Sequence, residues 1–517
     1  MSGGKEEPLG LSDEAALLQQ NGDLAQCVAR LRLLQRRLTE TDRWQLSPSV
    51  LWGLCGIIQG EAGKWGAEGA GQPAVSSLKV VSGALCCLRN ALPNCARNQL
   101  MLAETEELLK SILSCIQWTF KAPEAAHTSA EPSPDGRAVE AEEGEGSAES
   151  EWRTAHHTLA SSCVTCLGNL VAANSKTRRI VWPYFKLLLE DVLLFPDKEV
   201  AQAACMILHN CLLEADLKEE LCMSSLGQQV LTHLLTLYET ETKFSCFVLL
   251  SLEVLLAGRE VLAGAWGGLS EGHQRLVLEV VEARLTHSAA PHAAADVPPS
   301  LEFLVAEFKS KADCILRTHA DTDWMNPGSA QVLARLGTFV CASAASDTWR
   351  QTLQRDRSLL VTSVALLRCI SDIGKMGGNS FTPLDRLSDL SDEEQMARAE
   401  GHPAFGFKCD LIRLIASLVY RNSANQDLVR EMDGLLLVLE SSKFDARNPL
   451  IKEASIFALR NLLEGNIENQ QRIKELRMEG VVESPGLAEL GMEAVEEGGK
   501  VKLLQRPRSS SSPPPEL

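Results

Sequence analysis

Apolar residues recur along this chain at the three- and four-residue intervals that place side chains on one face of a helix. The clearest stretch is 450–463, whose apolar positions share one face: Ile451, Ala454, Ala458, Leu459 and Leu462. Leu and Ala are abundant, whereas only 3 Tyr and 13 Phe occur. This composition favours helices over sheets. The pattern therefore predicts an all-α protein.

Segment 425–466 contains three such helices separated by turn signals. We expect a first helix that Gly434 closes as its C-cap, and a second, apolar helix directly after it. The third helix is expected over 450–463, with Asn448 as its N-cap and Pro449 at its first position. Three helices in about 42 residues is the length of an armadillo or HEAT repeat.

A polar marker near the end of the third helix points to further copies of this unit. The marker is Asn90, Asn169, Asn210 and Asn461, with Ser417 in the equivalent place. An Asn-Gln pair begins eight residues after three of the markers, at 98, 425 and 469, where we expect it to open the next unit and hold the stack together. Single units cannot bury their apolar face alone. The expected fold is an armadillo/HEAT-like helical repeat solenoid, a right-handed superhelix of three-helix units.

One interval between markers is too long for a single repeat. Asn90 and Asn169 are 79 residues apart, but the tract 121–151 between them carries nine acidic and two basic residues. It has too little apolar surface to fold alone, so we expect a disordered loop before a third helix that begins near Trp152. The expected organisation is N-terminal repeats, the acidic loop, central repeats, a flexible loop, C-terminal repeats and a disordered tail: 1–120, 121–151, 152–373, 374–402, 403–505 and 506–517.

Charge and cysteine content narrow the class of partner. The formal net charge is −18, which argues against non-specific binding to nucleic acid or to anionic membranes. No apolar run reaches the length of a membrane helix, so we expect no membrane insertion. The first ten residues are polar and include Glu6 and Glu7, so no signal peptide is expected. The 16 Cys are then expected to be reduced, buried residues.

No motif for catalysis, a cofactor or a metal stands out. Cys163 and Cys166 have the spacing of a zinc or redox pair, but no second pair accompanies them, and core packing is the expected role. His156 and His157 lack acidic or Cys partners one helical turn away, and we expect a solvated helix start. Phosphate-loop, nucleophile-elbow and metalloprotease motifs are absent from the sequence. We therefore expect no enzymatic activity, no catalytic residues, no cofactor and no metal, with a cryptic enzyme as an alternative.

The recurring Asn admits two interpretations. In a stacked array, third helices line the concave groove, where Asn90, Asn169, Asn210 and Asn461 offer amide donors and acceptors to an extended peptide. In the other interpretation, the Asn side chains bridge adjacent repeats within the core. Arg89 and Arg460 lie one residue before two of the markers, and they are candidates for anchoring an acidic partner or for pairing with neighbouring Glu. Outside the repeats, Ser133 and Ser512 precede Pro in predicted disorder and are candidate phosphorylation sites.

Longer phrases resemble a known family. Residues 407–429 (FKCDLIRLIASLVYRNSANQDLV) and 456–470 (IFALRNLLEGNIENQ) closely resemble the C-terminal domain of the ataxin-10 family, and 87–91 (CLRNA) and 166–170 (CLGNL) resemble its N-terminal half. The resemblance implies an armadillo scaffold without enzymatic activity that stimulates protein O-GlcNAc glycosylation and acts in cytokinesis, neurite outgrowth through Ras–MAP kinase signalling, and neuron survival.

The same resemblance implies partners and a location. The implied partners are the O-linked N-acetylglucosamine transferase, a G-protein β subunit, mitotic kinases and further copies of the chain. The implied locations are perinuclear cytoplasm, centrosome, basal body and midbody. The family carries no catalytic residues to transfer. An importin-like transport adaptor is the alternative, but such arrays carry Trp before the groove Asn, and this chain has Cys86, Thr165, Met206 or Phe457 four residues before its markers.

Overall fold

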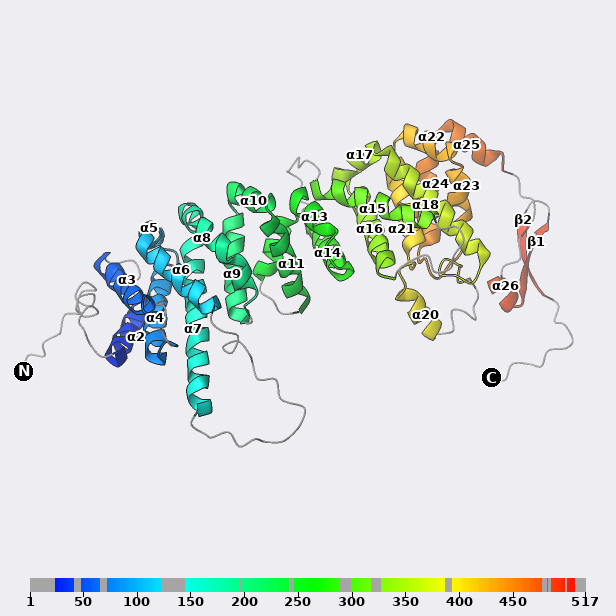
Figure 1. Cartoon of the computed structure of the whole chain (residues 1–517). Coiled ribbons are helices and arrows are strands. Elements are labelled where there is room, and N and C mark those ends of the chain that lie inside the picture. Colours follow the sequence, from blue (N-terminus) through cyan, green and yellow to red (C-terminus); the bar gives the residue numbers. More distant parts are fainter. Residues whose placement is uncertain are drawn as a thin grey trace, which may run out of the picture. The chain divides into compact units, whose positions relative to one another are not determined.

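The computed structural model describes most of the chain: residues 24–40, 48–65, 72–121, 145–195, 197–240, 246–287, 299–317, 327–385, 393–476, 481, 485–497 and 500–506. These residues form two compact units, Met1–Gly267 and Gly268–Leu517. Helices dominate both units, and a single two-stranded hairpin occurs among the described residues (Figure 1). The predicted all-α helical-repeat fold is confirmed.

Unit 1 is a stack of helices, and one helix from each successive repeat packs against its equivalent in the next repeat. Its elements are α2 (Leu24–Glu40), α3 (Pro48–Ala62), α4 (Val75–Ala91), α5 (Ala96–Glu104), α6 (Glu106–Lys121), α7 (Glu145–Val171), α8 (Ser175–Leu193), α9 (Lys198–Leu212), α10 (Ala215–Cys222), α11 (Ser225–Thr240), α12 (Cys246–Leu255) and α13 (Arg259–Trp266). Helices α2, α4, α7, α9 and α12 each pack against the next of this set. We call these the third helices of unit 1; three of the marker Asn residues lie near their C-terminal ends.

Unit 2 repeats the arrangement. It contains α14 (Glu271–His287), α15 (Pro299–Arg317), α16 (Pro327–Ala345), α17 (Asp347–Arg355), α18 (Arg357–Met376), α20 (Glu393–Glu400), α21 (Phe407–Val419), α22 (Ser423–Glu431), α23 (Gly434–Glu440), α24 (Ile451–Leu463), α25 (Ile467–Lys474) and α26 (Pro485–Glu489), then strands β1 (Met492–Glu497) and β2 (Lys500–Gln505). Helices α14, α16, α21 and α24 pack in sequence and are the third helices of unit 2.

The predicted three-helix unit is present as α22, α23 and α24, but its three punctuation residues act differently, and Pro449 precedes the N-cap of α24 instead of taking the first helical position. Gly434 begins α23, and α22 ends at Glu431 with Met432 as its C-cap. A Cβ on Gly434 would lie 2.7 Å from Val429 Cγ1, so close packing requires Gly there. Asn448 is not the N-cap of α24, which is Leu450. Asn448 instead accepts a hydrogen bond from the backbone of Cys409 at 3.2 Å, which ties the turn to the previous third helix.

The turns after the third helices share a backbone device. A residue with positive φ precedes the next helix in four places: Asn94, Ala173, Arg421 and Gly465. The following residue is Asn174, Asn422 or Asn466 in three of these turns, and its side chain accepts from the backbone N–H three residues on. This is N-capping geometry, so the short helices begin before the Asn-Gln pairs.

Several elements differ from the predicted organisation. Helix α7 begins at Glu145, inside the tract expected to be a loop, and residues 122–144 lie outside the described part of the chain. Helix α20 lies within 374–402, expected as a flexible loop. The antiparallel pair β1–β2, with Val495 opposite Lys502, was not predicted. The tail 507–517 lies outside the described residues.

Candidate partner-binding groove

The marker Asn side chains bond to the protein's own backbone. Asn169 Nδ2 donates to the carbonyl oxygen of Arg89 at 3.0 Å, and Asn461 Nδ2 donates to that of Ala416 at 2.9 Å. Each bond therefore joins one third helix to the preceding third helix. Asn461 is 1% exposed, so we do not place it on a partner surface.

Asn90 and Asn210 occupy the equivalent positions of their helices, but the hydrogen bond of Asn90 is longer and that of Asn210 stays within its own helix. Asn90 Nδ2 donates to the carbonyl oxygen of Gln35 at 3.5 Å, and Asn210 Nδ2 donates within its own helix to Met206 at 2.9 Å. Both side chains are half-buried, as is that of Asn169.

The Asn-Gln pairs form a second set of equivalent contacts, which we call the inter-repeat seam. The Asn of each pair donates to the carbonyl oxygen seven residues earlier, at 2.8 to 2.9 Å, in the third helix that has just ended: Asn98 to Ala91, Asn425 to Leu418 and Asn469 to Leu462. These bonds satisfy carbonyl groups that a helix C-terminus otherwise leaves without partners.

The Gln of the pair reaches the next repeat. Gln99 Nε2 donates to the carbonyl oxygens of Asn169 and Ala172, both at 2.9 Å. Gln426 Nε2 makes the equivalent bonds to Asn461 at 2.8 Å and Glu464 at 3.3 Å. These contacts confirm that Gln99 and Gln426 hold the stack together, whereas Gln470 donates to the carbonyl oxygen of Leu463, seven residues earlier. The pairs lie within the first turn of their helices and do not open them.

The seam contacts of two helices, α17 and α8, were not predicted from the sequence. Gln354 in α17 donates to the carbonyl oxygens of Ser417 and Tyr420 at 3.2 and 2.8 Å, although Leu353 replaces the Asn that would have revealed the pair. Thr177 and Arg178 take the two places of the pair in α8, with bonds to the carbonyl oxygens of Leu170 and Val171, seven residues earlier in each case.

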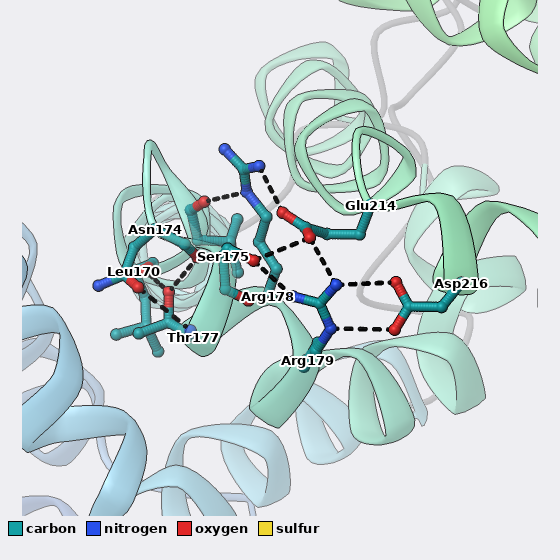
Figure 2. A network of polar contacts seen from close by, with 9 residues as sticks. Leu170, Asn174, Ser175, Thr177, Arg178, Arg179, Glu214 and Asp216 are labelled. Carbon is teal, nitrogen blue, oxygen red and sulfur yellow. Dashed lines mark hydrogen bonds and ion pairs between the residues drawn. The ribbon is translucent and has the colours of Figure 1, made fainter.

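In α8 the seam becomes ionic. Figure 2 shows that the Arg178 guanidinium, instead of donating to the next helix's carbonyls, pairs with Glu214 at 2.9 Å. Arg179 pairs with both Glu214 and Asp216, at 2.8 and 2.9 Å. Hydrogen bonds from Ser175 and Arg178 hold the pKa of Glu214 below its ordinary value, and Arg179 does the same for Asp216. This junction between repeats depends on specific side chains.

A trough of about 720 Å³ lies on the third-helix face of unit 1, between α4, α7 and α9. Arg89 is part of its wall, whereas Arg460 is exposed on α24 in unit 2. The remaining lining is polar: Cys86, Glu149, Ser150, Arg153, Thr154, His157, Thr158, Ser161, Ser162, Asp197 and Glu199. Arg153 pairs with Glu149 at 2.8 Å, and His157 Nδ1 lies 3.1 Å from Asp197 Oδ2.

The hydroxyls on the α7 side of the trough are oriented by their own helix. Thr154, Thr158 and Ser162 each donate to the carbonyl oxygen four residues earlier, at 2.6 to 2.9 Å. Their protons are used within the helix, so their remaining lone pairs are acceptors. This wall can accept hydrogen bonds from the N–H groups of a partner.

The two histidines differ from the expected solvated helix start. His156 is 0% exposed, stacks on Trp152 with ring centroids 5.0 Å apart, and has Nε2 3.1 Å from the carbonyl oxygen of Thr119. His156 is therefore a core residue on the buried face of α7. Cys163 and Cys166 are also fully buried, as predicted, and burial raises the pKa of Cys166 to about 12.

Among the described residues no group of three His, Cys, Asp or Glu side chains could hold a metal ion. Within the same residues, no helix is long and apolar enough to cross a membrane. The candidate phosphorylation sites Ser133 and Ser512 lie outside the described part of the chain.

Known proteins resemble the chain over much of its length. A family model described as the spinocerebellar ataxia type 10 protein domain matches residues 407–504, which include α21 to α25 and the hairpin. Ataxin-10 of Macaca fascicularis is 29% identical over 67% of this chain and 71% of its own length. Ataxin-10 of Xenopus tropicalis is 26% identical over 81% of this chain and 79% of its own. Over most of its length the chain is therefore similar to ataxin-10 proteins, and its C-terminal block matches the family model.

The family-matched block coincides with the best-formed part of the seam. Gln426, Asn461 and Asn469 all lie within residues 407–504, which the family model matches. A solved structure from work on a phosphorylation switch controlling the interaction between cadherin and β-catenin aligns with 88% of this chain and 83% of its own, at 12% identity and a TM-score of 0.21.

Proposed function

We propose that this chain is an ataxin-10 family member and a non-enzymatic scaffold whose unit 1 trough binds an extended segment of a protein partner. The observation that carries the proposal is the trough itself, a polar hollow on the third-helix face with Arg89 on one wall and Asp197 and Glu199 on another. An extended peptide has backbone N–H groups for the hydroxyl acceptors of α7, and its charged side chains suit walls of opposite sign.

The partners proposed from the family are the O-linked N-acetylglucosamine transferase, a G-protein β subunit, mitotic kinases and further copies of the chain. The proposed roles follow these partners: stimulation of O-GlcNAc glycosylation, cytokinesis, and neurite outgrowth and neuron survival through Ras–MAP kinase signalling. The proposed locations are perinuclear cytoplasm, centrosome, basal body and midbody. Nothing in the trough supports the alternative of an importin-like carrier, because its lining contains neither Trp nor Asn.

Site-specific photocross-linking tests the trough. A benzophenone amino acid is placed at Thr158, which lines the trough, and at Leu187 of α8, which is 74% exposed away from the lining set. Each chain is irradiated with purified transferase or with purified G-protein β subunit. We expect an adduct with at least one of them from position 158 and none from position 187.

A charge reversal then separates trough binding from incidental proximity. Arg89→Glu is expected to lower the adduct yield by about tenfold, because a charge pair at a close-fitting interface contributes on that scale. Arg97→Glu, on an exposed residue of α5 outside the lining, is the matched control and is expected to change nothing. Equal adducts from positions 158 and 187, or equal effects of the two reversals, would overturn the proposal.

A further inference from the structure

A second hollow lies in unit 2, far along the sequence from the trough. It has a volume of about 240 Å³ and is bounded by the end of α18, the segment 381–385, the start of α21 and the region between α23 and α24. Its lining is Ser371, Gly374, Lys375, Phe381, Pro383, Asp385, Lys408, Glu440, Ser441, Lys443, Phe444, Asp445 and Ile451. Ligand sites for drug-sized molecules usually exceed about 300 Å³, so this pocket suits a single side chain.

The charges around this pocket are unevenly compensated. The Asp445 carboxylate is 5% exposed and is already engaged, because it accepts from the backbone N–H groups of Leu384 and Arg447 and from the amide of Asn448. Glu440 pairs with Lys375 at 3.1 Å. Asp385 lines the pocket as a third acid, but no described carboxylate makes an ion pair with Lys408 or Lys443, and Asp445 and Glu440 act on Lys408 only at longer range.

Lys408 and Lys443 are left without an ion pair or hydrogen bond among the described residues. Lys408 is half-buried, and burial lowers the pKa of its amine. Asp445 and Glu440 oppose that effect, and the positive charges of Lys375 and Lys443 add to it. A half-buried ammonium group that no carboxylate contacts directly is costly. An anion placed in the pocket would relieve that cost.

A buried hydroxyl adds a neutral donor. Ser371 is 7% exposed, lines the same pocket, and its Oγ has no hydrogen-bond partner among the described residues. A buried polar group without a partner is uncommon and calls for an explanation. Three donors, two of them cationic, therefore surround one small hollow.

We propose that this pocket binds the phosphoryl group of a phosphorylated serine or threonine side chain, with Lys408, Lys443 and Ser371 as its donors. A phosphomonoester carries about −1.5 to −2 charges and three acceptor oxygens, one for each donor. A carboxylate offers a single charge and two oxygens. The rings of Phe381 and Phe444, the latter 60% exposed, provide apolar contact for the residue next to the phosphorylated one.

Calorimetric titration of the full-length chain at low salt tests the proposal. The probes are three capped tripeptides, Ala-phosphoserine-Ala, Ala-Glu-Ala and Ala-Ser-Ala. We expect saturable binding of the phosphorylated peptide, at least about tenfold weaker binding of the Glu peptide, and none of the unmodified peptide. Equal binding of the phosphorylated and Glu peptides, or no saturable binding, would overturn the proposal.

Substitutions locate the site. Lys408→Gln and Lys443→Gln are each expected to weaken binding of the phosphorylated peptide by about tenfold, and Ser371→Ala by a few-fold. Lys452→Gln removes an exposed lysine of α24 outside the pocket and should leave binding unchanged. Lys443 is exposed, so its variant remains informative if the change at Lys408 destabilises the fold. A loss at Lys452 equal to that at Lys443 would show non-specific attraction and refute the site.

The source of the phosphoryl group is a separate arm of the experiment. A peptide of residues 506–517 phosphorylated at Ser512 is titrated beside the tripeptide. Tighter binding of this peptide supports the chain's own tail as the source, and equal binding supports a partner's phosphorylated segment.

Discussion

Gln426 donates to the carbonyl oxygen of Asn461 at 2.8 Å, while Asn461 donates from its side chain to the preceding third helix through Ala416. The two residues thus form consecutive links of one chain of bonds that crosses three helices, α21, α22 and α24. The same relationship joins Gln99, Asn169 and Arg89 in unit 1.

Gln426→Ala is expected to destabilise the last repeats. Gln426 is 2% exposed, and its loss leaves the carbonyl groups of Asn461 and Glu464 without their donor, at a cost of about 1–3 kcal/mol. Urea unfolding of the full chain, followed by circular dichroism, measures the change. Gln471→Ala, at an exposed position of α25, is the control, with an expected effect within about 0.5 kcal/mol. Equal effects of the two substitutions would contradict a structural role for the seam.

Acid should weaken the ionic junction of α8 and α10. The pKa of Glu214 is lowered by Ser175 and by the two arginines from an ordinary value of 4.5. A lowered carboxyl pKa stabilises the fold above the ordinary value, and this stabilisation is lost as pH falls through the lowered one.

Glu214→Gln should therefore lower Tm at pH 7 by about 2–4 °C and flatten the fall in Tm below pH 4.5, the ordinary value for this group. Differential scanning fluorimetry across pH 3 to 7 provides the readout, on a scale of about a few degrees. Glu219→Gln, at an exposed position of α10, should keep the wild-type profile. An unchanged profile for Glu214→Gln would refute the linkage.

Two glycine substitutions should act in opposite directions. Gly434→Ala brings a Cβ within 2.7 Å of Val429 Cγ1 and 3.0 Å of the Val429 carbonyl oxygen, and is expected to destabilise by about 1–3 kcal/mol. Gly56→Ala lies inside α3, where a Cβ meets nothing within 4 Å, and should stabilise by about 0.5–1 kcal/mol. Thermal unfolding of both variants measures whether each substitution raises or lowers stability. A change in the same direction for both would contradict the packing described at α22 and α23.

The C-x-x-C cysteines should resist modification in the native chain. Cys163 and Cys166 are 0% exposed, and burial raises the pKa of the Cys166 thiol to about 12, so little thiolate forms at neutral pH. Cys246 is exposed at the start of α12 and serves as the internal reference. Iodoacetamide labelling at pH 8, read by peptide mass spectrometry, should modify Cys246 first and Cys163 and Cys166 only after urea is added. Native labelling of Cys166 at the rate of Cys246 would refute burial.

The helical pattern was readable from the sequence because apolar spacing depends on the period of one helix. The third helix predicted over 450–463 lies within a residue of α24. The contacts between repeats were harder to predict from the sequence, because they depend on the positions in space of carbonyl groups from another repeat. Gln354 is isolated in the sequence, and only the positions of Ser417 and Tyr420 in space show that it belongs with Gln99 and Gln426.

The residues of the candidate sites also divide into those that the sequence predicts and those that only the structure reveals. Arg89 was identified from the repeated phrase, and the structure places it in the trough wall. The companion residues Thr154, Thr158 and Ser162 share one face of α7 but carry no motif, and this face becomes the wall of a trough only when α4 and α9 pack beside it. The unit 2 pocket combines Ser371, Lys408 and Lys443 from three separate segments, a combination that no spacing rule in the sequence describes.

The glutamines of the seam bind main-chain oxygens, which every residue type supplies. A neighbouring repeat can therefore change its side chains, as at Ser417 in place of Asn, and still receive the Gln354 amide. Such a junction tolerates duplication, loss or exchange of whole repeats without matched substitutions. The Arg178–Glu214 junction lacks this freedom, because its two sides must vary together. An exchange of repeats at the boundary between α8 and α10 would therefore require matched substitutions on both sides.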